Sequence, residues 1–127
     1  MQLINKRRVV ITGIGIVSPV GIGVDPFWKN IVAGVSGVDH APILTRSECH
    51  WKIAGEVKDF RSEEWLGRKD AKRMDRFAQF ALVASYLALQ DSQLNLDNED
   101  RHRIGVSMGT AYAGLLFGAQ EYDVYKE

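Results

Sequence analysis

The chain has 127 residues, of which 16 are basic and 16 are acidic, so its formal net charge is zero. This balance argues against broad electrostatic binding of nucleic acid or of an anionic membrane, because either partner requires a generally basic surface. The hydrophobic fraction of 46% and the charged fraction of 25% are typical of a single globular domain of this length.

Three features of the sequence bear on its location. It contains no run of about 18 apolar residues, so no transmembrane helix is predicted. The first eight residues lack the apolar core and the cleavage site of a signal peptide. Cys49 is the only cysteine, which excludes an internal disulfide and favours a reducing compartment. We therefore expect a cytoplasmic protein.

The first predicted elements are a strand and a helix. Residues 8–12 form a short β-branched run closed by Gly13, which predicts a buried strand. A glycine-rich loop follows. Asp25 and Pro26 are then typical of a helix start, and Gly34 is the predicted end of that helix.

The middle of the chain predicts one strand and two helices. Apolar and polar side chains alternate over residues 51–57, as in a half-exposed strand, and residues 62–67 resemble a short helix closed by a glycine. A longer helix is predicted from near residue 69 to about Asp91. Its second half, residues 77–89, is apolar on almost every face, so we expect it to be buried on several sides.

The last third predicts a polar loop over residues 95–103, a second short buried strand over residues 104–109 and a helix over residues 113–126. The order strand, helix, helix, strand, helix favours an α/β layered fold with parallel strand pairing.

The glycine-rich loop partly matches a nucleotide-binding motif. Residues 13–18 follow a predicted strand, as the dinucleotide fingerprint requires. However, Ser18 stands where the third glycine should be, and Pro19 interrupts the helix that should begin there. We therefore do not expect a dinucleotide site.

No catalytic or metal-binding set is evident. His40, His50 and His102 lie far apart in the sequence, and Cys49 with His50 would supply only two of the roughly four ligands that a zinc site needs. Cys49 also lacks a predicted helix start beside it that would activate a thiol. The sequence predicts no catalytic residue, cofactor site or metal site.

Four cations share one face of the predicted long helix. Lys69, Lys72, Arg73 and Arg76 are spaced at i, i+3, i+4 and i+7. One interpretation is a docking site for an acidic partner. The other is a solvated helix face whose charge is reduced by nearby acids such as Asp70, and the pattern alone favours it. The four cations are not interleaved with aromatic residues, as a site for single-stranded nucleic acid would require.

A family resemblance is carried by four segments taken together: residues 7–21, residues 27–28 with 33–38, residues 53–60, and residues 73–77 with 79–81. In order and spacing they resemble the β-ketoacyl-acyl-carrier-protein synthases, in particular the synthase II type, and the resemblance extends over residues 6–114. It implies a thiolase-like layered α/β fold with two similar halves, usually a homodimer. Residues 1–127 would be the N-terminal portion of the synthase domain, within its first α/β half.

The resemblance also implies a chemistry. The family condenses an acyl thioester with malonyl-carrier protein by means of a cysteine nucleophile, two histidines and a lysine. Cys49 does not match the motif of that nucleophile, and the catalytic residues are expected beyond this chain, so we expect the chain alone to be inactive. No bound cofactor is implied, because phosphopantetheine arrives on the carrier protein.

In this family context the docking interpretation of the cations becomes the favoured one. Lys69, Lys72 and Arg73 align with the region where the synthases meet the acyl carrier protein, and Arg76 extends that face by our own inference. Gln93 stands where the family commonly has a glycine with positive φ, so a left-handed residue is expected there.

In the family, the position of Tyr112 usually holds a smaller apolar residue that guards the acyl pocket. The turn around this position usually contains more glycines in the family than it does here. A phenol there predicts a shortened or reshaped acyl tunnel. Alternatively, Tyr112 fills core space with its hydroxyl group satisfied by a neighbour.

Two functions remain open from the sequence. The first is the N-terminal portion of a condensing acyltransferase of the fatty-acid or polyketide type. The second is a non-catalytic subunit that binds carrier protein or sets chain length, in a homodimer or a ketosynthase heterodimer. The apolar helix favours the first, since in isolation it would expose a large apolar patch.

Overall fold

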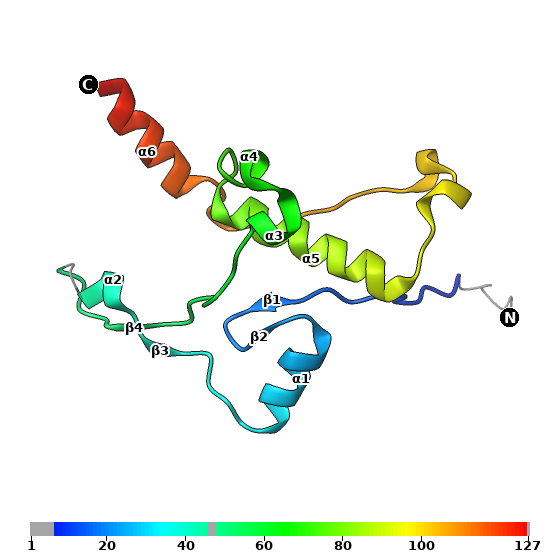
Figure 1. Ribbon diagram of the computed structural model, residues 1–127, viewed down its shortest axis with the longest axis horizontal. Coiled ribbons are helices and arrows are strands. Elements are labelled where there is room, and N and C mark those ends of the chain that lie inside the picture. The colour runs from blue at the N-terminus through cyan, green and yellow to red at the C-terminus, as the bar shows by residue number, and fades with distance from the viewer. Residues whose placement is uncertain (1–6, 46–47, 127) are drawn as a thin grey trace, which may run out of the picture.

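The computed structural model describes residues 7–45 and 48–126 (Figure 1). The elements are β1 (Val17–Ser18), β2 (Gly21–Ile22), α1 (Val24–Val32), β3 (Asp39–His40), α2 (Pro42–Thr45), β4 (Ile53–Ala54), α3 (Glu63–Leu66), α4 (Arg68–Ala71), α5 (Arg76–Ser92), the short 3-10 helices η1 (Leu96–Asn98) and η2 (Arg101–Arg103), and α6 (Leu115–Lys126). Figure 1 shows α5 across the middle of the molecule, with α6 projecting away from it at the C-terminal end.

The first two strands form an antiparallel hairpin. Val17 lies opposite Ile22, and Ser18 lies opposite Gly21. The Ser18 hydroxyl accepts hydrogen bonds from the amides of Val20 and Gly21, both at 3.2 Å, and donates one to the Gly21 carbonyl at 3.0 Å. One hydroxyl therefore satisfies the backbone groups of the turn, and it explains why a serine stands in the glycine-rich loop.

The predicted first helix is confirmed as α1. Gly34 follows its last turn with φ of 71°, a left-handed conformation that glycine adopts without a steric penalty. The helix begins one residue before Asp25, so Asp25 and Pro26 lie inside its first turn rather than at the predicted cap and first position. The Asn30 side-chain amide donates to the Val20 carbonyl at 2.7 Å, which ties α1 to the hairpin.

The segment before the hairpin crosses α5 with backbone against backbone. A Cβ atom added at Gly13 would overlap the carbonyl oxygen of Ala88, and one added at Gly15 would overlap that of Ala84 and lie 2.6 Å from the Ala88 nitrogen. Ala84 and Ala88 are one helical turn apart, so they present a flat strip of small side chains to the crossing segment. The glycines of the weak nucleotide motif are therefore packing residues in this structure.

The two long strands that were predicted are not formed. Residues 8–12 and 104–109 make no ladder with any described strand, and Figure 1 shows both as extended stretches. Val9 and Val106 are 92% and 85% exposed, so these stretches are not buried as predicted. Strands of parallel sheets are covered on both faces and need strand neighbours, which the described residues do not supply.

Both ladders among the described residues are antiparallel, so the predicted parallel pairing is not seen there. The strand predicted over residues 51–57 forms only the two residues of β4, with Ala54 opposite Asp39 of β3. The helix predicted over residues 62–67 is confirmed as α3, which ends at Gly67 with φ of 75°. The mixture of helices and strands agrees with the predicted α/β class.

The predicted long helix is divided into α4 and α5. The Gln79 side-chain amide donates to the carbonyls of Ala71 at 2.7 Å and Met74 at 3.0 Å, so the backbone groups freed by the break are satisfied. α5 then runs to its predicted end. Gln93 follows it with φ of 53° and ψ of 23°, which confirms the expected left-handed residue.

The described residues bury little apolar surface. The accessible surface is 11449 Å², whereas the scaling for folded monomers predicts about 6,800 Å² for a compact protein of 14.2 kDa. Val83 is the only residue of α5 in the buried class, and Leu82 and Tyr86 are 41% and 50% exposed. The expected burial of α5 on several sides is thus not met by the described residues. None of the described helices is long and apolar enough to cross a bilayer.

The crossing of Gly15 over α5 can be tested by adding one methyl group. We expect Gly15→Ala to lower the free energy of unfolding of the full-length protein by about 1–3 kcal/mol, because its Cβ would force the two backbones apart. Lys29→Ala, at an exposed position of α1, is the control. It should change the free energy of unfolding by less than about 0.5 kcal/mol. Similar unfolding midpoints in urea for both variants would contradict the close crossing.

Candidate functional site

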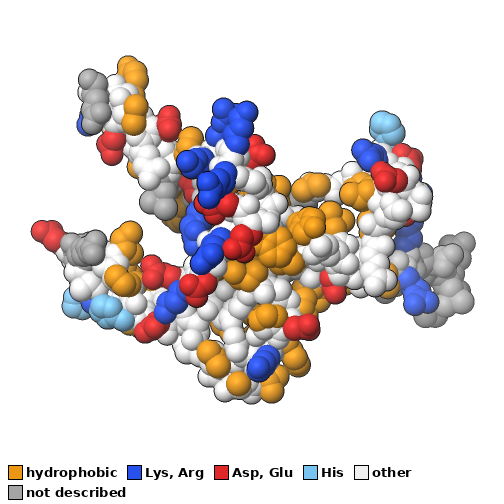
Figure 2. All heavy atoms as spheres, viewed as in Figure 1, with side chains coloured by type: hydrophobic (Ala, Val, Ile, Leu, Met, Phe, Trp, Pro, Cys, Tyr) orange, Lys and Arg blue, Asp and Glu red, His pale blue; other side chains and the backbone are white. Residues whose placement is uncertain are grey.

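The candidate site is a group of exposed cations on α4 and just after it, which we call the basic surface: Lys69, Lys72 and Arg73, with Arg76 at the start of α5. Figure 2 shows Lys and Arg side chains gathered over this part of the molecule, with acidic side chains between them. None of the ion pairs among the described residues includes Lys69, Lys72 or Arg73. Their charges are therefore available to a partner.

The basic surface does not lie on one continuous helix, which corrects the sequence interpretation. The chain leaves helical geometry between α4 and α5, where Asp75 has φ of −62° and ψ of 152° and serves as the N-cap of α5. Hydrogen bonds from Gln79 to the carbonyls of Ala71 and Met74 hold this break. The spacing of the cations gave no sign of it, because the break depends on a side chain from the next helix.

Arg76 differs from the other three cations because its guanidinium group is held within the chain. Its Cζ atom lies 4.9 Å from the ring centroid of Phe80 and 5.3 Å from that of Phe60, and its Nη2 atom donates to the Val57 carbonyl at 3.0 Å. Phe60 is only 8% exposed and packs edge-on against Phe80, with 4.8 Å between the two ring centroids. Arg76 thus fastens residues 57–60 to α5, a role that sequence reasoning missed.

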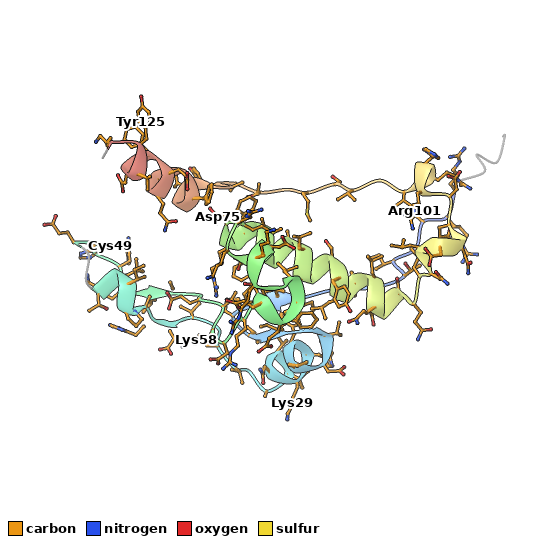
Figure 3. All side chains as sticks on the ribbon, turned by 45° about the horizontal axis from the view of Figure 1, so that its top comes forward. Lys29, Cys49, Lys58, Asp75, Arg101 and Tyr125 are labelled. Atoms are coloured by element: carbon orange, nitrogen blue, oxygen red, sulfur yellow. The ribbon has the colours of Figure 1, made fainter. Side chains whose placement is uncertain are left out.

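An ion pair lies near the basic surface. The Lys58 ammonium group lies 2.8 Å from the Asp39 carboxylate, and Figure 3 shows Lys58 in the segment that follows β4. The hydrogen bond from Lys58 lowers the pKa of Asp39, with smaller contributions from the His40 amide and from the Lys58 charge. The same hydrogen bond raises the pKa of Lys58. Lys58 is therefore neutralised by its partner and adds little to the basic surface.

The histidines and the cysteine do not converge. His40, His50 and His102 are all exposed, and Cys49 is half-buried. The His40 ring contacts the Thr45 hydroxyl at 3.3 Å. Within residues 7–45 and 48–126, no group of three or more His, Cys, Asp or Glu side chains is arranged to hold a metal ion.

Tyr112 lies in the turn that precedes α6 and is 83% exposed. It borders a shallow hollow of about 560 Å³ between this turn and the first turns of α6, which Gly114 and Gly118 also line. Its hydroxyl group makes no hydrogen bond with the described residues, so Tyr112 does not fill core space among them. The phenol is instead exposed on the surface of the described residues.

The chain matches one sequence family over nearly its whole length. The family described as β-ketoacyl synthase, N-terminal domain, matches residues 6–127. The protein 3-oxoacyl-[acyl-carrier-protein] synthase 2 of Vibrio cholerae is 41% identical over 111 residues, and that of Staphylococcus aureus is 40% identical over 111 residues. Each alignment covers 87% of this chain and 27% of the relative, so the chain spans about a quarter of the length of these relatives.

Solved structures show the same likeness. The ishigamide ketosynthase/chain length factor has a TM-score of 0.65 and 33% identity, over 72% of this chain and 23% of that chain. A second solved structure is a type II polyketide synthase acyl-carrier protein in complex with its ketosynthase, bound to the hexaketide. Its TM-score is 0.57, with 37% identity over 76% of this chain and 22% of that chain. A β-ketoacyl synthase from Burkholderia phymatum gives a TM-score of 0.61 and 31% identity, over 73% of this chain and 23% of that chain. These neighbours confirm the predicted thiolase-like fold class.

The contacts of Arg76 predict that it matters more for stability than its exposure indicates. Arg76→Ala should lower the free energy of unfolding of the full-length protein by about 1–3 kcal/mol, through loss of the cation–π contacts and of the hydrogen bond to Val57. Arg76→Lys should recover only part of this loss, because an ammonium group lacks the planar surface with which a guanidinium group stacks on aromatic rings. Arg73→Ala, the matched control, should change stability by less than about 0.5 kcal/mol. Equal midpoints of urea unfolding for the two alanine variants would contradict this role of Arg76 in holding residues 57–60 against α5.

Proposed function

The chain belongs to the β-ketoacyl synthase family, and from this membership we propose that it is the leading part of a 3-oxoacyl-acyl-carrier-protein synthase. The proposed reaction condenses an acyl thioester with malonyl-carrier protein and so elongates an acyl chain. The observation that carries this proposal is the identity of about 40% to synthases of that name along 87% of the chain.

In the proposed enzyme the basic surface docks the acyl carrier protein. Lys69, Lys72 and Arg73 are exposed and make no ion pair with the described residues, and a related ketosynthase has been solved in complex with its acyl-carrier protein. An exposed ion pair contributes only about 0–1 kcal/mol, so the surface would orient the carrier and speed its encounter more than it would hold it. Arg76 would contribute at the edge, because its guanidinium group is already stacked.

We assign no step of bond making to a residue of this chain. The proposed condensation needs a thiolate that accepts the acyl group and groups that assist loss of carbon dioxide from the malonyl unit. Cys49 lies in the segment between α2 and β4, next to the exposed His50, and does not match the family motif of the nucleophile. The chain would bind and orient the carrier protein, while the reacting groups come from the remainder of the synthase.

The turn before α6 is the proposed wall of the acyl pocket. It is exposed among the described residues and borders a hollow into which further parts of the synthase would pack. A phenol at Tyr112 takes up volume that several methylene groups would otherwise fill. We therefore propose that Tyr112 limits the length of the acyl chain.

The second candidate function is that of a non-catalytic partner, which binds carrier protein or sets chain length. The observation that supports it is the TM-score of 0.65 with a chain from a structure that contains a chain length factor as well as a ketosynthase. A homodimer would suit the first function and a ketosynthase heterodimer the second. For both we propose the cytoplasm, since the lone Cys49 forms no internal disulfide.

Binding of an acyl carrier protein tests the docking proposal. We expect the combined variant Lys69→Ala, Lys72→Ala, Arg73→Ala of the full-length protein to raise the Kd for carrier protein about ten- to a hundredfold at low salt. The effect should shrink as salt is added, because exposed charges are screened. Calorimetric titration at two salt concentrations would measure it.

The control for this titration is Arg103→Ala, an exposed cation on η2, at the other end of α5 from the basic surface (Figure 1). It should leave the Kd within about twofold. A triple variant that binds as tightly as the native protein, or an Arg103 variant that binds as weakly as the triple variant, would show that the carrier docks elsewhere.

The two candidate functions predict different products. If the full-length protein is the condensing enzyme, it should by itself convert acyl-carrier and malonyl-carrier protein into a 3-oxoacyl product with release of carbon dioxide. If it is the non-catalytic partner, product should form only after a second ketosynthase subunit is added. Mass spectrometry of the carrier-bound product separates these outcomes, and no product in either case would refute both.

A further inference from the structure

One carboxylate links the basic surface to the turn that carries Tyr112. Asp75 lies between the cations Arg73 and Arg76 in the sequence, yet it joins none of the ion pairs among the described residues. Its Oδ2 atom instead accepts a hydrogen bond of 3.1 Å from the amide of Phe117, 42 positions along the chain. Figure 3 shows Asp75 beside the chain that enters α6.

This hydrogen bond caps α6. The first amides of a helix have no partner within the helix, and a carboxylate is a favourable acceptor for them. Gly114 precedes α6 with φ of 74° and has no side chain that could supply the cap. Phe117 is the third residue of the helix, which is a usual donor position for a capping side chain. Asp75 therefore supplies from a distant segment what the local sequence lacks.

Asp75 is also fixed at its own end. Its carbonyl accepts hydrogen bonds from the amides of Ala78 at 3.0 Å and Gln79 at 3.1 Å in the first turn of α5. The residue thus starts α5 with its backbone and α6 with its side chain. Among the hydrogen bonds between described residues, the one to Phe117 is alone in joining α6 to an earlier element.

From these contacts we infer that Asp75 is a positioning residue, which holds the Tyr112 turn in register with the basic surface and thereby sets how far that turn protrudes into the acyl pocket. This inference rests on the proposed function, in which the basic surface docks the carrier and the turn lines the pocket. A carrier bound at Lys72 and Arg73 would then lie at a fixed distance from the wall that its acyl chain must pass.

The first test measures the link itself and needs no activity. Asp75→Ala in the full-length protein should speed hydrogen exchange at the Phe117 amide by about tenfold, as expected for loss of a cap. Asp75→Asn keeps an acceptor oxygen and should restore the native rate within about threefold. Glu99→Ala is the control, because Glu99 makes no side-chain hydrogen bond or ion pair with the described residues. Unchanged exchange in Asp75→Ala would overturn the inference.

The second test measures acyl selectivity. The ratio of kcat/KM for a long acyl-carrier substrate to that for a short one should rise about tenfold in Asp75→Ala and in Tyr112→Gly, while Asp75→Asn stays near the native ratio. If Tyr112→Gly changes the ratio and Asp75→Ala does not, the positioning role is wrong and the pocket assignment stands. If neither variant changes it, the proposed pocket itself is wrong. Faster Phe117 exchange would then support only the structural link.

Discussion

The structure depends on one close crossing, that of the glycine segment over α5. Two backbones can approach this closely only where neither carries a side chain larger than a methyl group, and Gly13 and Gly15 meet the carbonyls of Ala88 and Ala84. The amide of Ile14 also donates to the Asp91 carboxylate at 2.8 Å, which fixes the segment along the helix. Because the hairpin and α1 follow directly, the crossing also fixes where they lie relative to α5.

The same crossing shows how a sequence motif can carry two meanings. A strand followed by a glycine-rich turn is typical both of phosphate binding and of close backbone packing. The departures at Ser18 and Pro19 counted against a nucleotide site, and the structure assigns both residues to the hairpin turn. What the sequence could not indicate was the partner of the glycines, since Ala84 and Ala88 lie about 70 positions away in an unremarkable helical pattern.

Features that depend on local chemistry could be predicted, whereas those that depend on distant partners could not. The end of α3 at Gly67 follows from the backbone preference of glycine, whereas the left-handed residue at Gln93 was expected only from the family resemblance, since glutamine itself disfavours positive φ. The strand over residues 104–109 was not found, since a buried strand needs neighbours that the described residues lack. Likewise, the spacing of the cations indicated the candidate site, but the stacking of Arg76 depends on Phe60 and Phe80.

The zero net charge of the chain conceals a local imbalance. The ion pairs among the described residues join Lys58 to Asp39, Arg61 to Glu64 and Arg101 to Asp97. The cations on and just after α4 have no such partner. Asp70 and Asp75 lie next to them in the sequence, and Asp75 accepts a hydrogen bond from α6 instead of pairing with a cation. Because charges in physiological salt act over only about 8–10 Å, a partner would sense these unpaired cations rather than the sum over the chain. A backbone amide does not neutralise a carboxylate, so the hydrogen bond between Asp75 and Phe117 anchors the turn with Tyr112 while Asp75 joins no ion pair on the basic surface.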